Sequence, residues 1–203
     1  MASAQNPSYA MRCLGSDADG VADLLDDFVS GMREGGLSVT LKTFPGIGNV
    51  SADVTESIAE NTDSLMTIRD TNFVPYASGI QAGADCVMVS NAAYSKLTVK
   101  KVPAFMSQDI VTKLLREELG FDGIVMTSPL NDNVIENNYT NEFAVVEAVK
   151  AGCDLIVLPG NFKECYEALI TAVEEGRIDE KVINTSVRRI LQNKIQRGIL
   201  VLE

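Results

Sequence analysis

Residues 42–49, KTFPGIGN, have the composition of a loop at the mouth of an active site. They follow the β-rich run LSVTL and include a proline, two glycines and an asparagine, which are turn-forming residues. The ionisable side chain of this loop is Lys42, and the whole chain contains no histidine. Because catalytic proton transfer usually relies on histidine or a carboxylate, the loop supplies neither of the usual groups.

The residue types do not predict a metal site, a redox site or a nucleotide-binding site. Cys13, Cys86, Cys153 and Cys165 lie far apart without CxxC spacing, and in a chain without histidine they do not predict a zinc site. We expect buried, reduced thiols, no metal and no other cofactor. The sequence GIGN lacks the third glycine and the immediate helix of a dinucleotide-binding loop.

The charge balance narrows the class of ligand. The 203 residues include 17 basic and 28 acidic side chains, a formal net charge of −11. Nucleic acids and anionic membranes attract basic patches, so the charge argues against both and leaves a neutral ligand such as a sugar. No apolar run is long enough to cross a bilayer, and the first residues lack a signal-peptide pattern. We expect a cytoplasmic location as the sequence stands, or a secreted or lipoprotein-anchored one if its start is trimmed.

Alternating helices and strands must position the loop. We expect a loop over residues 49–62 and a single α/β domain of parallel βα units over residues 1–203. Two architectures fit, an open doubly wound sheet or part of a (β/α)₈ barrel. Apolar spacing predicts helices over residues 21–34, 72–83, 107–119, 141–151, 162–175 and 179–197, and strands over residues 37–44, 86–90, 124–127 and 153–160.

Five ordered segments resemble glycoside hydrolase family 3, specifically its β-N-acetylglucosaminidase type. They are RCLGSDADGVADLLDDFVSGMREGGLSVTLKTFPGIGN, IQAGADCVMVSNAAY, VPAFMSQDIVTKLLREELGFDGIVMTS, AVKAGCDLIVLPGNFKE and IDEKVINTSVRRIL. The resemblance implies a retaining hydrolase of β-linked N-acetylglucosamine, with its site at the carboxyl ends of a TIM-like (β/α)₈ barrel. It extends from about Arg12 to Ile199 and implies the C-terminal half of that barrel, with closing C-terminal helices.

Both catalytic positions of the family are changed in this chain. The resemblance aligns Ser128 with the nucleophilic aspartate, and Asp53 and Thr55 with the aspartate–histidine pair that donates the proton. A serine hydroxyl without an activating base cannot replace the nucleophile, and a threonine hydroxyl has too high a pKa to be the acid. Asp132, four residues after Ser128, could substitute only through a rearranged loop.

The family's sugar-contacting positions are partly retained. Arg12 and Lys42 match the family, while Thr43, Ile47 and Asn91 stand where the family has histidines. The resemblance therefore gives Arg12, Lys42, Thr43 and Asn91 as candidate substrate-binding residues.

Purely structural roles are the alternatives for the retained residues. Arg12 could form an ion pair with Asp17 or Asp19, Lys42 could be a solvated lysine at a strand end, and Asp53 could be a turn residue.

The expected strands are half the eight of a full barrel. Half a barrel would leave main-chain groups unpaired at both outer strands and an inner face in water. A second copy could close the barrel by twofold symmetry. Another chain carrying the missing half could pair with it instead, or the N-terminal segment could cover an open sheet.

The leading functional hypothesis is a degenerate family 3 protein with little or no hydrolytic activity. The first alternative is an active β-N-acetylhexosaminidase that another subunit or a non-standard residue completes. The second is a sugar-binding or regulatory module that keeps Arg12 and Lys42 for recognition, and the third is a purely structural oligomer or gene fragment.

Overall fold

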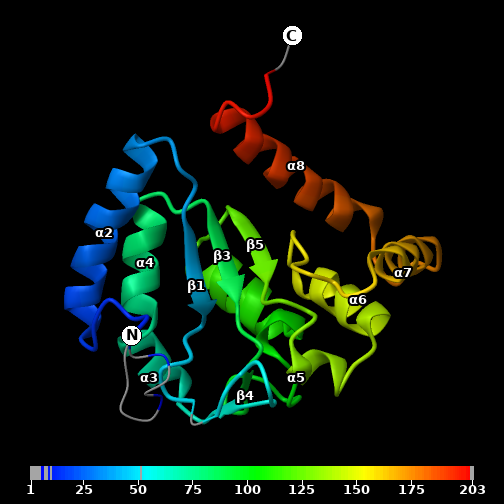
Figure 1. Ribbon diagram of the computed structural model, residues 1–203, viewed down its shortest axis with the longest axis horizontal. Coiled ribbons are helices and arrows are strands. Elements are labelled where there is room, and N and C mark those ends of the chain that lie inside the picture. The colour runs from blue at the N-terminus through cyan, green and yellow to red at the C-terminus, as the bar shows by residue number, and fades with distance from the viewer. Residues whose placement is uncertain (1–5, 7–8, 10, 51, 202–203) are drawn as a thin grey trace.

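The computed structural model describes residues 6, 9, 11–50 and 52–201, and a parallel sheet lies at its centre (Figure 1). In this described part, three strands pair in the order β1 (Thr40–Phe44), β3 (Cys86–Val89) and β5 (Ile124–Thr127). The register shifts between Lys42 and Phe44, at the carboxyl end of β1. The predicted α/β class with parallel strands is confirmed, and the sheet is open rather than a closed barrel.

Helices flank the sheet on both sides and across one end (Figure 1). The pair α2–α4 lies beside β1, α6 packs on α7 beyond β5, and α8 crosses near the amino ends of the strands. The helices are α2 (Ala18–Glu34), α3 (Leu65–Asp70), α4 (Phe73–Gln81), η1 (Ala104–Met106), the π-helix η2 (Asp109–Glu118), α5 (Asn133–Glu136), α6 (Asn141–Ala151), α7 (Phe162–Glu174) and α8 (Glu180–Gln196).

The predicted helices all form near their expected bounds, and side-chain caps account for several starts. Asp17 accepts a hydrogen bond from the Gly20 N–H at the start of α2 (2.8 Å), and Thr140 accepts one from the Phe143 N–H at the start of α6 (3.2 Å). Gly152 ends α6 with a φ of 110°, a left-handed conformation that favours glycine.

The predicted fourth strand, residues 153–160, is wrong as a regular strand. Leu155 forms an isolated parallel bridge with Met126, and its N–H donates to the Val125 carbonyl (3.1 Å). Val157 is the next residue after Leu155 whose N–H would point toward β5. This N–H donates to the Thr127 hydroxyl (3.1 Å) instead of to a main-chain carbonyl. A side chain therefore takes the hydrogen bond that would extend the ladder, and Leu158, with a φ of 44°, departs from strand conformation.

Five short elements were not predicted, among them η1 (Ala104–Met106) and α5 (Asn133–Glu136). Helix α3 lies in a stretch with no expected element, and β2 (Glu60–Asn61) and β4 (Ala93–Tyr94) pair with each other as a small parallel ribbon. Two-residue strands are too short to show a period in sequence.

The two faces of the sheet differ in burial. Val87, Val89 and Val125 are completely buried on the face that the helices cover. Met88 and Met126 alternate with them on the opposite face and are only half-buried. The second face is thus incompletely covered in the described chain, as expected for half of a barrel.

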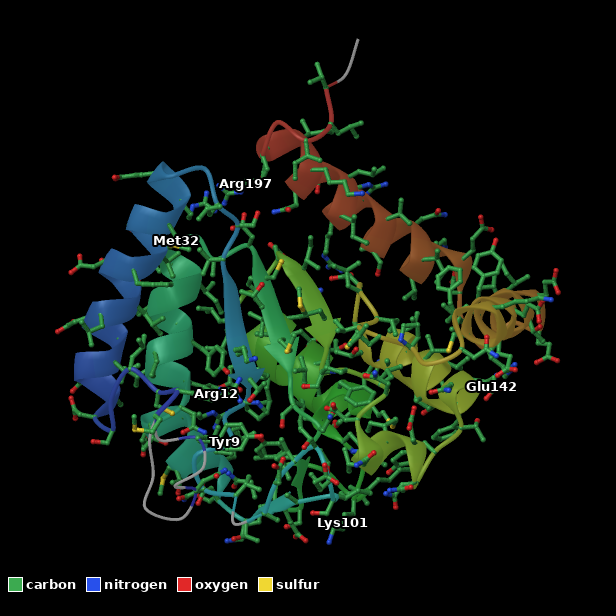
Figure 2. The ribbon with its side chains drawn as sticks, viewed as in Figure 1. Tyr9, Arg12, Met32, Lys101, Glu142 and Arg197 are labelled. Atoms are coloured by element: carbon green, nitrogen blue, oxygen red, sulfur yellow. The ribbon has the colours of Figure 1, made fainter. Side chains whose placement is uncertain are left out.

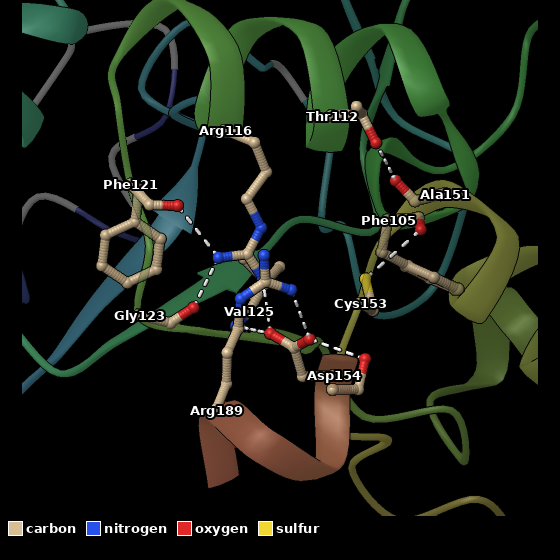
Figure 3. A network of polar contacts seen from close by, with 11 residues as sticks. Phe105, Thr112, Arg116, Phe121, Gly123, Val125, Ala151, Cys153, Asp154 and Arg189 are labelled. Atoms are coloured by element: carbon tan, nitrogen blue, oxygen red, sulfur yellow. Dashed lines mark hydrogen bonds and ion pairs between the residues drawn. The ribbon is translucent and has the colours of Figure 1, made fainter. Parts of the chain in front are cut away.

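Buried carboxylates hold the amino ends of the strands together. Asp154 accepts hydrogen bonds from the Val125 N–H (2.9 Å) and the Ser186 hydroxyl (2.7 Å), and it pairs with Arg116 and Arg189 (Figure 3). The Arg116 guanidinium also donates to the main-chain carbonyls of the turn before β5. This single carboxylate therefore joins η2, β5 and α8.

Asp85 makes a similar junction before β3. Its carboxylate accepts from the Val39 N–H (2.9 Å) and from Asn193 (3.0 Å), and it pairs with Arg33 (3.2 Å) and Arg197. It therefore ties α2, β1 and α8 to one point.

These junctions determine which face of α8 points inward. Ser186, Arg189, Asn193 and Arg197, spaced three or four residues apart, form its inward stripe. The apolar residues Val187, Leu191 and Ile195 remain 45%, 42% and 38% exposed on the same helix. Helix α8 thus presents polar groups to the sheet and an apolar row to the outside. None of the helices in the described ranges is both long and apolar enough to cross a membrane.

Asp154→Asn should destabilise the fold strongly. The substitution leaves the largely buried Arg116 guanidinium and the partly exposed Arg189 without their counter-charge. Breaking a buried pair costs about 3–5 kcal/mol. Urea unfolding of this variant should show a clearly lower midpoint. Asp109→Asn, which breaks an exposed pair with Lys113, is the matched control and should unfold like the unaltered chain. Equal midpoints for the three proteins would contradict the proposed role of the Asp154 junction.

Candidate functional site

A cavity of about 390 Å³ lies at the carboxyl ends of the strands. The predicted site residues around it are Arg12, Lys42, Thr43, Thr55, Asn91 and Ser128. Tyr9 and Asp132 also line it, and Asp53 adjoins it through its contacts with Thr55 and Tyr9. The structure thus brings together around one cavity residues that lie far apart in the sequence.

The loop after β1 is fixed from two sides. Asn72 donates to the Pro45 carbonyl (2.9 Å), and the Tyr94 hydroxyl donates to the Gly46 carbonyl (2.9 Å). Gly46 has a φ of 125°, and a Cβ there would approach the Asn72 side-chain nitrogen to 2.3 Å, so the turn requires glycine. These contacts set the direction in which the chain leaves Lys42 and Thr43.

Ser128, at the end of β5, is turned toward the main chain. Its residue is buried, and its hydroxyl donates to the Val89 carbonyl at 2.9 Å. No base among the described residues is hydrogen-bonded to this hydroxyl, so nothing activates it as a nucleophile.

Asp53 and Thr55 form a local hydrogen-bonded turn at the cavity rim. The Asp53 carboxylate accepts from the Thr55 N–H (2.9 Å), from the Thr55 hydroxyl (2.8 Å) and weakly from the Tyr9 hydroxyl (3.5 Å). The bonds from the Thr55 N–H, then from the Thr55 and Tyr9 hydroxyls, hold the pKa of Asp53 below its ordinary value. Asp53 is therefore an ionised acceptor, and Thr55 is its donor.

Two cations face the cavity without an acidic partner among the described residues. The Arg12 guanidinium lies 5.3 Å from the centre of the Tyr9 ring, and Figure 2 shows the two side chains next to each other near the end of β1. The alternative ion pair of Arg12 with Asp17 or Asp19 is wrong, since neither carboxylate is paired with it. Lys42 is exposed at the end of β1, next to the cavity.

Asn91 and Asp132 form a hydrogen-bonded pair in the cavity wall. The Asn91 Nδ2 donates to Asp132 Oδ2 at 2.8 Å, which joins the chain after β3 to the start of α5. Partial burial raises the pKa of Asp132, as do the charges of Asp53 and Glu56, while the bond from Asn91 lowers it. The pKa of Asp53 is therefore lowered while that of Asp132 is raised.

The cysteines take no part in a cluster. Cys86, Cys153 and Cys165 are buried free thiols as expected, whereas Cys13 is only half-buried and faces the cavity. In the described part of the chain, no three Cys, Asp or Glu side chains come close enough to hold a metal ion.

Comparison with known proteins assigns the chain to a family. The sequence profile of the "Glycosyl hydrolase family 3 N terminal domain" matches residues 1–193. The chain belongs to glycosyl hydrolase family 3. The resemblance expected from the sequence is thus confirmed over nearly the whole chain.

Relatives of this family 3 chain include enzymes that act on hexosaminides. It is 28% identical over 96% of its length to a β-N-acetylglucosaminidase/β-glucosidase of Cellulomonas fimi, and 31% identical over 96% to a β-hexosaminidase of Stenotrophomonas maltophilia. The structure of a family 3 β-N-acetylglucosaminidase from a Paenibacillus species superposes with a TM-score of 0.93, with 32% identity over 99% of this chain. The chain spans 36%, 55% and 40% of these three proteins, respectively.

Sequence reasoning missed two residues of the family 3 cavity. Tyr9, which contacts Arg12 and Asp53, precedes every matched motif and carried no signal. Asp132 was considered only as a replacement nucleophile, and its partner Asn91 was considered separately. Both residues lie in the loops that follow two neighbouring strands, β3 and β5, and this was the available signal, because the carboxyl ends of such strands meet.

Opposite changes in the Asp132 pKa should follow from two substitutions. Asn91→Ala removes the donor that stabilises the carboxylate, so the Asp132 pKa should rise. Asp53→Asn removes a nearby like charge, so the pKa should fall. Carboxyl ¹³C NMR titration of the three proteins measures these values directly. A shift of the same sign in both variants would show that the two interactions do not act on Asp132 as described.

Proposed function

We propose that this family 3 domain recognises a β-linked N-acetylglucosaminyl group and does not cleave it. The observation that carries the proposal is the Ser128 hydroxyl, which the sequence resemblance aligns with the family's nucleophile and which donates to the Val89 carbonyl. A retaining glycosidase needs two carboxyl groups, or an equivalent pair, about 5 Å apart across the glycosidic bond. A neutral hydroxyl bonded to the main chain provides no such nucleophile.

The proton-donor position supports the same proposal. Thr55 donates its hydroxyl to Asp53, whose lowered pKa keeps it ionised at neutral pH. An ionised carboxylate can accept hydrogen bonds from a ligand but cannot protonate a leaving group. The pair therefore suits binding better than acid catalysis.

Recognition is supported by the groups that surround the cavity. Arg12 and Lys42 offer hydrogen-bond donors, and Asn91 and Asp132 offer acceptors. A sugar with an acetamido group matches this mixture, because its hydroxyls donate and accept while its carbonyl only accepts.

One observation favours a second candidate function. Asp132 brings a carboxylate into the same cavity as Lys42, and its raised pKa is the direction expected of a proton donor. In that case the domain would be a β-N-acetylhexosaminidase that uses Asp132 in place of a family residue.

A chromogenic assay separates the two functions. We expect no release of 4-nitrophenol from 4-nitrophenyl β-N-acetylglucosaminide by the unaltered chain, because no activated nucleophile is present. Saturation-transfer NMR with methyl β-N-acetylglucosaminide should nevertheless show binding. Turnover that disappears in Asp132→Asn would establish the second candidate, and turnover that disappears in Ser128→Ala or Asp53→Asn would overturn the proposal altogether.

We further propose that a second copy of this chain covers the open side of the sheet. Edge strand β1 lies beside α2, on which Leu24 and Phe28 are each 51% exposed. The extended chain at Leu155 forms the other edge, near the exposed apolar row of α8. A twofold rotation about an axis along the strands would place β1 of one copy beside the Leu155 segment of the other. The three strands and this segment from each copy would then give eight parallel segments, as in a barrel.

Light scattering tests this assembly. The 203-residue chain should have a solution mass of about twice 21.9 kDa. Phe28→Lys places a charge among the exposed apolar residues of α2, and Leu191→Lys places one in the apolar row of α8. Each substitution should reduce the solution mass to that of one chain. Met66→Lys, on an apolar residue of α3 that is even more exposed (70%), is the control and should leave the dimer intact. A single-chain mass for the unaltered protein would exclude self-closure.

A further inference from the structure

We propose that Asn91 and Asp132 act together as an acceptor pair for two neighbouring hydroxyl groups of the bound sugar. The inference rests on the proposed carbohydrate recognition and assigns a role to Asp132, which the resemblance does not place in the site. It concerns the wall of the cavity at the ends of β3 and β5, where Asn91 and Asp132 are bonded to each other and share the cavity with Arg12 and Lys42.

The first observation is an unsatisfied acceptor. Asn91 is 1% exposed, and its Nδ2 is bonded to Asp132, which fixes the orientation of the side-chain amide. Its Oδ1 is buried and accepts no hydrogen bond from any described residue. Because leaving a buried polar atom unpaired costs free energy, a ligand donor at this atom would be stabilising.

The second observation is that Asp132 does not cap its helix. Asp132 precedes α5 with the extended backbone of an N-cap residue, and its main-chain carbonyl accepts from the Ile135 N–H (2.8 Å). An aspartate here would ordinarily turn its carboxylate to the helix N–H groups, yet this one makes no such bond. The carboxylate instead lines the cavity, with Oδ2 held by Asn91.

The pair therefore offers two unpaired acceptor oxygens at this wall, beside the second N–H of the Asn91 amide. Asp132 Oδ1 takes no hydrogen bond from the described residues, and it lies in the same bonded pair as the free Asn91 Oδ1. Two acceptors fixed relative to each other match two donors on adjacent carbons of a sugar ring. Hydrogen bonds to an ionised acceptor are stronger than those between neutral groups.

Charge restricts the ligand group that can occupy this wall. Asp53 and Glu56 both act on Asp132, so the local field is negative. A ligand carboxylate or phosphate would be repelled here, while uncharged hydroxyls would be accepted. The inference therefore specifies a neutral polyol face at the Asn91–Asp132 pair, with the acceptor groups of the sugar toward Arg12 and Lys42.

The experiment compares two probes and four proteins. The probes are methyl β-N-acetylglucosaminide and its tri-O-methyl derivative, which keeps the ether oxygens but has no hydroxyl donors. The proteins are the unaltered chain, Asp132→Asn, Asn91→Ala and the control Asp122→Asn, which removes an exposed carboxylate at the opposite end of β5. Affinities come from protein-observed ¹⁵N NMR titration, and circular dichroism verifies that each variant is folded.

We expect the unaltered chain and Asp122→Asn to bind the free glycoside alike and to bind the O-methylated probe at least about tenfold more weakly. Asp132→Asn and Asn91→Ala should bind the free glycoside about tenfold more weakly and lose most of the discrimination between the probes. The NMR signals of the Asn91 side-chain N–H₂ group in the unaltered chain should shift when the glycoside binds. This readout needs no variant, so it remains available if a variant does not fold.

Two results overturn the inference in distinguishable ways. If the unaltered chain binds the glycoside but Asn91 signals do not move and both pair variants bind normally, carbohydrate recognition stands and the acceptor pair is wrong. If the unaltered chain binds neither probe, the proposed recognition itself fails, and the inference fails with it.

Discussion

Two buried carboxylates, Asp85 and Asp154, fix the arrangement on which the rest of this domain depends. Each accepts a main-chain N–H at the amino end of a strand and pairs with arginines from surrounding helices. A buried charge is tolerated only when it is paired and hydrogen-bonded, so these contacts determine where η2 and α8 must lie. Among the described residues no such junction forms at the carboxyl ends of the same strands, where side chains line the cavity instead.

The separation of the two strand ends would let the family scaffold persist if its chemistry changed as proposed. Changes at Ser128 and Thr55 touch neither carboxylate junction. Both hydroxyls are satisfied locally, by the Val89 carbonyl and by Asp53 respectively, so they fit the fold without the proton transfers that an aspartate and a histidine would provide. A scaffold with its stabilising ion pairs at one end and its ligand groups at the other can lose one function and keep the other.

The sequence was sufficient for most of the architecture, because apolar periodicity and strand–helix alternation are local signals. It failed where a side chain decided the outcome, as at Thr127, whose hydroxyl takes the Val157 N–H and interrupts the predicted fourth strand. The site followed mainly from the family resemblance, which predicted six residues around the cavity. The Asn91–Asp132 bond joins residues 41 positions apart, so it could be inferred only from the pairing of β3 with β5 and not from a local pattern.

The incompletely covered face of the sheet has a chemical consequence. Met88 and Met126 lie half-buried there, side by side on paired strands. Oxidants convert methionine to a polar sulfoxide, and this lesion is incompatible with close apolar packing. The extent of oxidation at these two positions would accordingly increase with the time that the face stays uncovered. An oxidised molecule would also pack less well against anything that later covers the face.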